Sequence, residues 1–316
     1  MNGVINVYKE PGYTSHDVVA KLRGILHMKK IGHTGTLDPQ AEGVLPVCLG
    51  NATKLCDMLT DNTKEYEAVL RLGITTDTQD MTGTVLEEKN VDCSEIDIKN
   101  IMSTFVGKGE QIPPMYSALK VNGKKLYELA REGKEIERKP RPIEIIALEI
   151  LECHLPLIRF RVECSKGTYI RTLCQDIGQK AGCGGCMEHL KRTRVERFVA
   201  EDALLLSEIE NLQQEGKLAE RIVAVEDMFD QYPKAIVENR YRKAIDNGNS
   251  ISAEMILRYE PERDGETTNN GTNLAAEGMR VRVYNEDGIF YGIYTYVEEE
   301  HRYKPYKMFI DRERIS

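Results

Sequence analysis

The sequence contains no long hydrophobic run, and this absence excludes a membrane-spanning helix. Hydrophobic residues make up 41% of the chain and charged residues 30%, but no apolar stretch approaches the roughly 20 residues that a bilayer requires. The N-terminus, MNGVINVYKEPG, also lacks the basic start and the apolar core of a secretion signal. We therefore expect a globular protein of the cytoplasm, and its 316 residues favour two domains.

A disulfide framework is also lacking. The eight cysteines are scattered along the chain, and several fall at apolar positions of predicted strands or helices, as is typical of buried thiols in a reducing compartment. Only the CGGC segment, Cys183 to Cys186, has the spacing of metal ligands, and only Cys174 and His189 are close enough in sequence to complete a tetrahedral zinc site. The pattern favours structural cysteines over zinc.

Net positive charge, which is typical of nucleic-acid-binding proteins, is absent as well: the formal net charge is -8. Residues 201–230 hold nine acids and two basic residues, and thus contribute -7 of this total. From Lys120 to Arg141, by contrast, eight Lys or Arg face four Glu, and the segment HLKRTRVER (189–197) is basic too. Either basic cluster, taken alone, is typical of a solvated surface.

Periodicity and turn signals predict a mixture of strands and helices. Residues 3–8 form a predicted strand, which is followed by a helix with Ser15 as its N-cap. Ser94 and Asp97 form a predicted capping box at the start of a helix. The remaining predictions are strands at 64–73, 143–153 and 157–164, a strand-to-helix turn at SKGTYIRTL, and a hairpin with Asp287 and Gly288 at its turn.

One carboxylate stands in an unusual position, in the segment GHTGTLDPQAEGVLPVCLG (32–50). Asp38 lies in a stretch rich in glycine and proline, directly before the apolar run VLPVCLG, which has the character of a buried strand. An isolated Asp before Pro is most often a turn residue. A stiff loop that holds a single acid beside an apolar wall is also what a reaction needs when it uses a carboxylate in a dry pocket.

Several segments together resemble the bacterial TruB family, which makes pseudouridine at position 55 of the tRNA T loop. The resemblance runs from about residue 3 to 231 and rests on these segments: GHTGTLDPQAEGVLPVCLG, KEYEAVLRLG, TDTQDMTG, PPMYSALKVNGKKLYELAR, CSKGTYIRTL and HLKRTRV. In KEPG, Pro11 follows Lys9 by two positions, whereas the family usually has Pro directly after Lys. This departure concerns only the geometry of the N-terminal loop.

The resemblance implies an α+β fold with two domains. The expected catalytic domain spans residues 1–231 and has the pseudouridine synthase fold, a mixed and mostly antiparallel central sheet flanked by helices and loops. A basic thumb insertion is expected at about 107–141, and a small PUA-like RNA-binding β domain at 232–316. RNA that is recognised by shape and backbone needs distributed Lys and Arg, so the resemblance favours RNA contacts for both basic clusters.

The resemblance also assigns the chemistry to three side chains. Pseudouridine formation breaks the N-glycosidic bond of uridine, rotates the uracil and rejoins it through carbon, so it needs a carboxylate at the sugar. Asp38 corresponds to that carboxylate, and Arg171 of GTYIRT to its partner, which would keep the acid ionised in a closed pocket. Tyr66 corresponds to the ring that replaces the lost base stacking and is placed to move protons on the rotated base.

Further positions match residues that contact the substrate in the family. These residues are Lys9, His33, Asp80, Tyr169 and Leu190, together with Tyr66 itself. His33 matches the residue that enters the T loop, and Leu190 matches one that lines the uracil pocket. Asp80 is equally compatible with a turn residue. The expected partner is the tRNA T stem-loop, with no cofactor, no metal, no membrane, no obligate protein partner and a monomeric state.

Two other function classes remain open on the sequence. An RNA-binding module without chemistry would keep the basic insertion at about 107–141 and the C-terminal domain at 232–316. It has no use, however, for Asp38 and Arg171 in a dry pocket. A glycoside hydrolase also breaks a glycosidic bond, but it usually places two carboxylates around it, and Glu42 is the only other acid in the Asp38 motif. Whether Asp38 attacks C1′ or removes the C2′ proton stays open as well.

Overall fold

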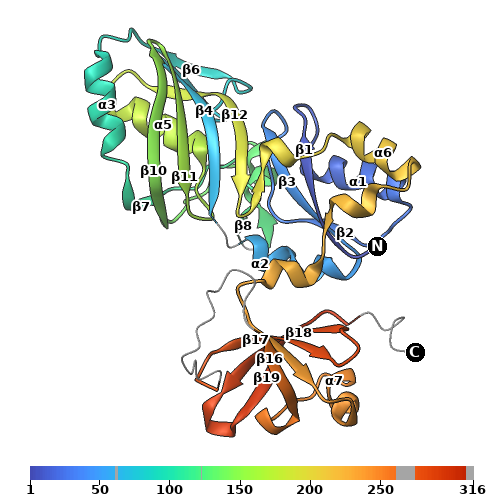
Figure 1. Ribbon diagram of the computed structural model, residues 1–316. Helices are drawn as coiled ribbons and strands as arrows, with labels where there is room; N and C mark the ends of the chain where they lie inside the picture. Colours follow the sequence, from blue (N-terminus) through green and yellow to red (C-terminus); the bar gives the residue numbers. More distant parts are fainter. Residues whose placement is uncertain (61–62, 122, 261–274, 311–316) are drawn as a thin grey trace.

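The computed structural model describes residues 1–60, 63–121, 123–260 and 275–310, without the side chain of Thr60. Two sheets dominate it, a large one built from residues 3–223 and a small one built from residues 234–308 (Figure 1). The segment ERDGETTNNGTNLAAEG (262–278) has the composition of a polar loop, and most of it lies outside the described residues. No helix in the described part of the chain is long and apolar enough to cross a membrane.

Ten strands of the described residues form the large sheet, in the order β14-β1-β3-β12-β4-β11-β10-β7, with β2 beside β3 and β13 beside β12. All neighbours are antiparallel except β3 and β12. The predicted α+β class with a mixed, mostly antiparallel sheet is therefore confirmed. The strands are β1 (Gly3–Lys9), β2 (Ile31–His33), β3 (Glu42–Leu49), β4 (Lys64–Leu72), β7 (Gly107–Gln111), β10 (Arg141–His154), β11 (Leu157–Cys164), β12 (Gly185–Val195), β13 (Phe198–Val199) and β14 (Ile222–Val223).

The parallel pair divides the large sheet into two halves that meet over only two residue pairs. Lys191 of β12 lies beside Glu42 of β3, and Arg192 lies beside Gly43. Gly43 has a φ of 105°, and a Cβ atom at this position would collide with the backbone of Arg192. A glycine is required here because the two strands approach too closely for a side chain and because other residues rarely adopt this φ.

Each half of the large sheet has its own helices. Helices α1 (Ser15–Leu26) and α6 (Leu206–Gln214) pack on the half that contains β1 and β3, and bury Val18, Leu22 and Ile209. Helices α3 (Glu95–Ser103) and α5 (Ile170–Lys180) cover one face of the other half, so that Met102 and Leu173 meet the strands β4 and β11.

The starts of two helices test the predicted caps. The box formed by Ser94 and Asp97 is confirmed at the start of α3. The prediction of Ser15 as the N-cap of α1 is wrong, because Thr14 caps this helix in a capping box with Asp17. Ser15 is buried instead, and its hydroxyl accepts a hydrogen bond from the backbone N–H of Leu37 at 2.9 Å.

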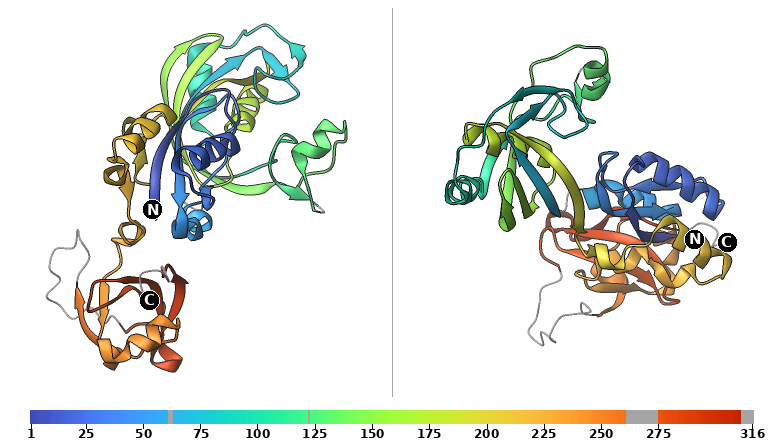
Figure 2. Two further views of the ribbon diagram at one scale, coloured as in Figure 1. Left: turned by 90° about the vertical axis from the view of Figure 1, so that its right-hand side faces the viewer. Right: turned by 90° about the horizontal axis from the view of Figure 1, so that it is seen from above.

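The basic insertion begins and ends at the edge of the large sheet. Its first residues form β7, which pairs with the start of β10, so residues 107–111 and Arg141 belong to the sheet. The part that projects as an arm is residues 112–140 (Figure 2, left). The arm contains β8 (Lys120–Val121), β9 (Lys124–Lys125) and α4 (Leu126–Arg131).

The described residues after 233, called the tail below, form a five-stranded sheet with the order β16-β15-β17-β18-β19. The predicted hairpin at Asp287 and Gly288 joins β17 to β18 and is confirmed. Ile293 and Phe309 of the tail share a hydrophobic core with Leu55 and Phe229. The elements of the tail are β15 (Lys234–Val237), α7 (Arg242–Asp246), β16 (Ile256–Glu260), β17 (Arg280–Asn285), β18 (Phe290–Val297) and β19 (Arg302–Met308). Three elements of the first part of the chain lie outside the large sheet, namely α2 (Cys56–Thr60), β5 (Ile74–Thr76) and β6 (Val85–Glu88).

Replacing Gly43 by Ala should destabilise the fold at the junction of the two halves. The new methyl group would force β3 away from β12 in a backbone conformation that alanine rarely adopts, and we expect the free energy of unfolding to fall by more than about 2 kcal/mol. Gly24→Ala on the open surface of α1 is the matched control, and it should raise that free energy by about 0.5–1 kcal/mol. Urea unfolding measures both variants, and equal stability of the two would contradict this account.

Candidate active site

Asp38 lies on the loop between β2 and β3, and the backbone of this loop is held at several points. The N–H of Gly12 donates to the carbonyl of Pro39 at 2.9 Å, and the N–H of Ala41 donates to the carbonyl of Asp38 at 3.1 Å. Ser15 binds the N–H of Leu37 from the start of α1. The loop that carries the acid is therefore fixed against β1 and α1.

Lys9, at the end of β1, lies beneath this loop. Its side chain is fully buried, and its ammonium donates hydrogen bonds to the carbonyls of Glu10, Pro39 and Ala41. Burial, partly offset by the charge of Asp38, lowers the pKa of Lys9 to about 8. All three donors are thus used by loop carbonyls, a geometry that positions the loop and leaves no ammonium hydrogen open to a ligand.

The Asp38 carboxylate is bound by Arg171, the second residue of α5. Nε of Arg171 lies 2.8 Å from Oδ2 of Asp38, and Nη2 lies 3.3 Å from Oδ1, so the contact is bidentate. The Arg171 side chain is 6% exposed and that of Asp38 is 37% exposed. The guanidinium is therefore locked inside the protein while the carboxylate remains open to a ligand.

Two backbone carbonyls and a second acid complete the surroundings of Arg171. Its Nη1 donates to the carbonyl of Thr78 at 3.1 Å, and its Nη2 donates to the carbonyl of Tyr116 at 2.7 Å. Oδ2 of Asp80 lies 3.9 Å from Nε of Arg171, while Oδ1 of Asp80 accepts hydrogen bonds from the hydroxyls of Thr78 and Thr82. Asp80 therefore both organises its own turn and adds negative charge beside Arg171.

The electrostatics of Asp38 result from opposing effects. Burial is the largest of these and raises the pKa of the carboxyl group, Arg171 works against it, and the nearby charge of Asp80 raises the pKa further. Without Arg171 the acid would be driven toward its neutral form. The pKa of Asp38 is still raised overall, so the ion pair limits the effect of burial on a carboxylate that stays accessible.

The apolar wall beside Asp38 is not built by the run that follows it in sequence. The residues of β3 turn into two other cores: Val44 and Cys48 on one face, Leu45 on the other. Leu37, Ala41, Tyr66 and Leu190 instead belong to one buried cluster with β4, β11 and α5. The expected wall exists, but the Asp38 loop itself and strands distant in sequence provide it.

Tyr66 of β4 is paired with Arg192 of β12 in the antiparallel register. Arg192 is 1% exposed, and its guanidinium donates to the carbonyl of Val44 at 2.7 Å and to that of Gly35 at 3.2 Å. Burial raises the pKa of the Tyr66 phenol, and the charge of Arg192 lowers it. Arg192 therefore links the Tyr66 side chain to the loop that carries Asp38.

Two further candidates, His33 and Tyr169, lie at the border of the site. The ring of His33 meets that of His16 edge to face, with centroids 5.4 Å apart. Burial is the largest effect that lowers the pKa of His33 to about 4, so its ring is neutral near pH 7. Tyr169 is half-buried at the N-cap of α5, where burial raises the pKa of its phenol.

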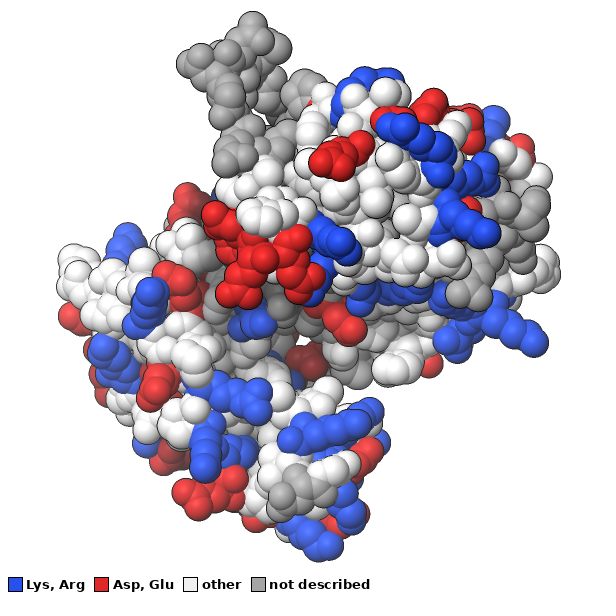
Figure 3. All heavy atoms as spheres, turned by 90° about the horizontal axis from the view of Figure 1, so that it is seen from below, with Lys and Arg blue, Asp and Glu red and all other residues white. Residues whose placement is uncertain are grey.

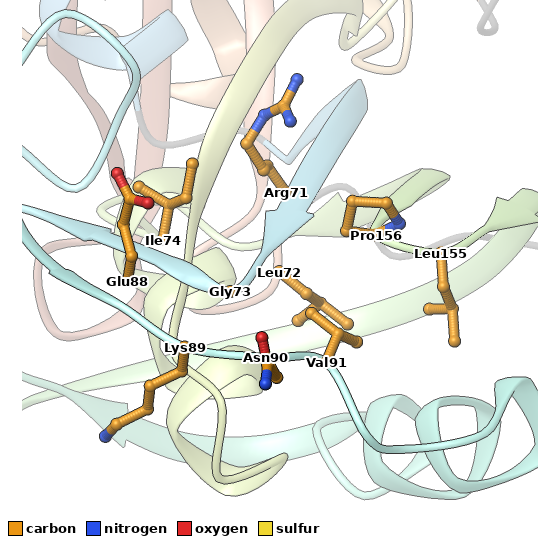
Figure 4. Close-up of a pocket in the computed structure, with 10 residues that line it drawn as sticks. All are labelled: Arg71, Leu72, Gly73, Ile74, Glu88, Lys89, Asn90, Val91, Leu155 and Pro156. Atoms are coloured by element: carbon orange, nitrogen blue, oxygen red, sulfur yellow. The ribbon is translucent and has the colours of Figure 1, made fainter.

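The CGGC segment shows no metal site among the described residues, and the recess with well-defined walls that the structure shows elsewhere is not at Asp38. No group of His, Cys, Asp and Glu in residues 1–60, 63–121, 123–260 and 275–310 has the arrangement of a metal site. A recess of about 750 Å³ opens at the end of β4 distant from Tyr66 (Figure 4). It is lined by residues such as Arg71, Lys89 and Pro156, none of which has a role in the resemblance.

The basic segment 189–197 presents less free basic surface than its composition suggests. Arg192 is buried, Arg194 pairs with Glu65 and Glu163, and Arg197 pairs with Asp230. The inward direction of Arg192 follows from strand alternation, because it lies two residues from the buried Leu190. That signal was available in the sequence.

Sequence reasoning missed Gln111 and the carbonyls of Thr78 and Tyr116. Gln111 binds the backbone of Tyr169 through both atoms of its side-chain amide. Because a carbonyl belongs to every residue, no residue type marks the ones that bind Arg171. The arrangement as a whole presents one accessible carboxylate with a fixed cation, beside a buried phenol and an apolar wall, as attack on a sugar or removal of its proton requires.

The stability of α5 should respond to pH through Asp176, an acid of the same helix that lies outside the site. Burial raises its pKa to about 6, so the folded state binds the proton more tightly than the unfolded chain does. Its stabilising contribution is present below about pH 4 and is lost as the pH rises to about 6. Asp176→Asn should therefore raise the free energy of unfolding by about 1 kcal/mol at pH 7.5 and leave it unchanged at pH 4. Urea titrations at both pH values measure this, and a pH-independent difference would contradict it.

The chain is similar in sequence to a known family of proteins. The model of the TruB family pseudouridylate synthase (N terminal domain) matches residues 23–170, and that of the tRNA pseudouridylate synthase B C-terminal domain matches residues 171–230. The chain is 51% identical to tRNA pseudouridine synthase B of Lachnoclostridium phytofermentans, over 98% of this chain and 100% of that protein. It is 47% identical to the protein of that name from Alkaliphilus oremlandii, over 81% and 85% of the two chains.

A solved structure also resembles the whole chain. A chain in the crystal structure of a Cbf5-Nop10-Gar1 complex superimposes with a TM-score of 0.71 and 27% sequence identity. The match covers 98% of this chain and 86% of that chain. The likeness therefore includes both the large sheet and the small sheet of the tail.

Proposed function

Because the chain belongs to the TruB family of pseudouridylate synthases and is therefore an isomerase, we propose that it converts uridine 55 in the T loop of tRNA to pseudouridine. The observation that carries the proposal is the Asp38 carboxylate, which Arg171 holds in bidentate contact while the acid stays open to a ligand. The reaction neither adds nor removes atoms. The N-glycosidic bond breaks, the uracil rotates in place, and its C5 carbon bonds to C1′ as the C5 hydrogen leaves and N1 gains a proton.

Asp38 begins the reaction at the sugar. Its carboxylate either attacks C1′ or removes the C2′ proton, and each route needs the ionised form that Arg171 favours. The hydrolase alternative is weaker, because Glu42 is held by the hydroxyl of Tyr8 at 2.9 Å and the imidazole of His189 at 3.0 Å. Asp80 is engaged by its own turn and by Arg171, so it is not a second carboxylate free to flank the bond.

Tyr66 and Leu190 support the flipped base. Both belong to the buried cluster that also contains Leu37, the neighbour of Asp38, and an aromatic ring there compensates for lost base stacking. Tyr66 is also the group that moves a proton on the rotated uracil. Tyr169 contacts the target nucleotide, and the neutral ring of His33 enters the T loop where bases are displaced.

The remaining candidates have supporting roles. Lys9 acts on the substrate through the Asp38 loop that it fixes, and Asp80 acts through Arg171. Residues 1–231 form the catalytic domain and residues 232–316 a PUA-like domain that adds RNA contacts. The protein works in the cytoplasm as a monomer on tRNA, without a cofactor.

Asp38→Asn should abolish turnover while the protein stays folded. The amide keeps the size of the side chain but can neither attack the sugar nor remove its proton, so the rate should fall by at least about three orders of magnitude. The free energy of unfolding should fall by no more than about 1–3 kcal/mol, because Arg171 keeps the carbonyls of Thr78 and Tyr116. Pseudouridine in an unmodified tRNA transcript, mapped by carbodiimide-blocked primer extension, measures the activity.

The control for this variant is Asp57→Asn on the exposed side of α2, which should make pseudouridine at the wild-type rate. An Asp38→Asn protein that is as active as the wild type would refute the role of Asp38. A wild-type protein that binds tRNA but makes no pseudouridine would favour the RNA-binding module instead.

Neutralising the arm should weaken tRNA binding and reduce its salt dependence. Lys and Arg gather on the arm, which projects at the bottom of Figure 3, and Lys120, Lys124 and Lys139 are exposed there. Replacing these three by Gln should lower the slope of log K against log salt by about 0.7–0.9 for each phosphate that is no longer neutralised. Lys21→Gln with Lys99→Gln, which removes two exposed charges from α1 and α3, is the control outside the arm. Filter binding between 50 and 300 mM salt, roughly the range in which such contacts respond, measures the slope, and an equal slope in both variants would exclude the arm from binding.

A further inference from the structure

Gln111 is the last residue of β7, at the point where the sheet edge becomes the arm, and its side chain is turned inward. It is 3% exposed. Its Oε1 accepts a hydrogen bond from the N–H of Tyr169 at 2.8 Å, and its Nε2 donates to the carbonyl of Tyr169 at 3.1 Å. The amide thus pairs with the backbone of Tyr169 as a neighbouring strand would, although Gln111 and Tyr169 are 58 residues apart.

The residue that receives this pair is the N-cap of α5, two positions before Arg171. The side chain of Tyr169 makes no capping hydrogen bond, and its carbonyl also accepts from the N–H of Leu173 at 3.0 Å. Residues 111–117, the arm root, therefore supply the partner of the Tyr169 N–H and a second donor to its carbonyl. Further along the arm root, the carbonyl of Tyr116 accepts from Arg171, and the buried Ser117 lies beside the Tyr169 phenol. Residues 111–117 therefore hold the start of α5 at several points.

The arm root is also stiff. Pro113 and Pro114 are buried between Gln111 and Tyr116, and their rings fix two backbone φ angles in this short segment. Because the arm has fewer free backbone angles at its root, a displacement of the arm is expected to reach the groups that hold Tyr169 and Arg171. The same segment joins the basic surface of the arm to the ion pair of Asp38.

We propose that Gln111 is a positioning residue for the isomerisation, because its amide fixes the Tyr169 backbone and thereby aligns Arg171 with Asp38 when the arm is docked. The inference rests on the proposed function, since it concerns the same reaction. Gln111 touches neither the uridine nor the reacting atoms. Its loss should slow the chemical step while RNA binding by the arm persists, since a misplacement of about 1 Å can cost up to about a hundredfold in rate.

The donor and acceptor of the amide allow a specific test. A protonated Glu has the shape of Gln and offers one O–H donor and one carbonyl acceptor, whereas an ionised Glu has no donor for the carbonyl of Tyr169. Burial favours the protonated form of such a carboxyl group. Gln111→Glu should therefore be impaired at pH 8 and recover relative to the wild type at pH 6, whereas Gln111→Leu should be impaired at both.

The measurement is the single-turnover rate of pseudouridine formation at saturating enzyme on an unmodified tRNA transcript, together with the Kd for that transcript. We expect Gln111→Leu to lower the rate at least about tenfold with a Kd within about threefold of the wild type. The ratio of the Gln111→Glu rate to the wild-type rate should rise at least about tenfold from pH 8 to pH 6. Circular dichroism at each pH verifies folding.

Gln79→Glu is the matched control for added charge near α5. Oε1 of Gln79 only accepts a hydrogen bond, from the hydroxyl of Thr172 at 2.7 Å, so a carboxylate serves there as well. Its rate relative to the wild type should be the same at pH 6 and pH 8. This control separates the loss of a donor from a general effect of negative charge.

Several outcomes would overturn the proposal. A Gln111→Glu to wild-type ratio that is constant with pH, or a Gln111→Leu rate within about twofold of the wild type, would show that the amide pair does not serve the chemistry. Unfolding of Gln111→Glu at both pH values would assign Gln111 to folding alone. A wild type inactive on tRNA would contradict the proposed function itself, and that result is visible before any variant is compared.

Discussion

The ion pair between Asp38 and Arg171 is the contact on which the rest of the site depends, because a carboxylate in a crowded site must be kept ionised and accessible at the same time. Burial pushes the acid toward its neutral form, and Arg171 offsets this effect only while the guanidinium stays fixed. The two residues are 133 positions apart and come from a loop after β2 and from the start of α5. Every element that orients either partner, including the turn of Asp80 and the arm root at Tyr116, therefore acts on the carboxylate.

Two buried cations frame the Asp38 loop from below, and both bind carbonyl oxygens. The ammonium of Lys9 donates to the loop carbonyls of Pro39 and Ala41, after the acid. The guanidinium of Arg192 donates to the carbonyl of Gly35, before the acid, and to that of Val44 in β3. Hydrogen bonds from charged donors are stronger than neutral ones, and a buried charge without such partners would be costly. The loop is thus kept in one conformation by groups that are themselves buried. This arrangement explains how a segment rich in glycine can place a carboxylate with precision.

Much of the fold and part of the site could be predicted from the sequence. Alternating residues placed β4 and β11, the Ser94 box placed the start of α3, and the TruB-like motifs singled out Asp38 and Arg171, which the structure brings together. The errors share a physical cause: they concern contacts between distant segments and backbone atoms. Ser15 is a plausible cap in sequence, but its hydroxyl is needed by the Asp38 loop. Arg192 belongs to a basic cluster in sequence although its alternation with Leu190 points it inward, and nothing in the sequence marks the carbonyls that bind Lys9 or Arg171.

The position of the site in the sheet connects these observations. Asp38 belongs to the half that contains β3, whereas Tyr66, Leu190 and Arg171 belong to the half that contains β4, β12 and α5. The halves meet over two residue pairs at Gly43, so this short junction alone would tolerate a shift of one half against the other. Three polar contacts connect the halves at this junction. Arg192 of β12 donates to the carbonyl of Gly35 in the Asp38 loop, Arg171 of α5 binds Asp38, and His189 of β12 binds Glu42 of β3. A reaction that breaks a bond and rejoins the same two fragments requires the sugar and the base to be held by one rigid frame. The polar contacts across the junction, together with the apolar cluster that Leu37 and Ala41 share with Tyr66 and Leu190, make one frame of the two halves.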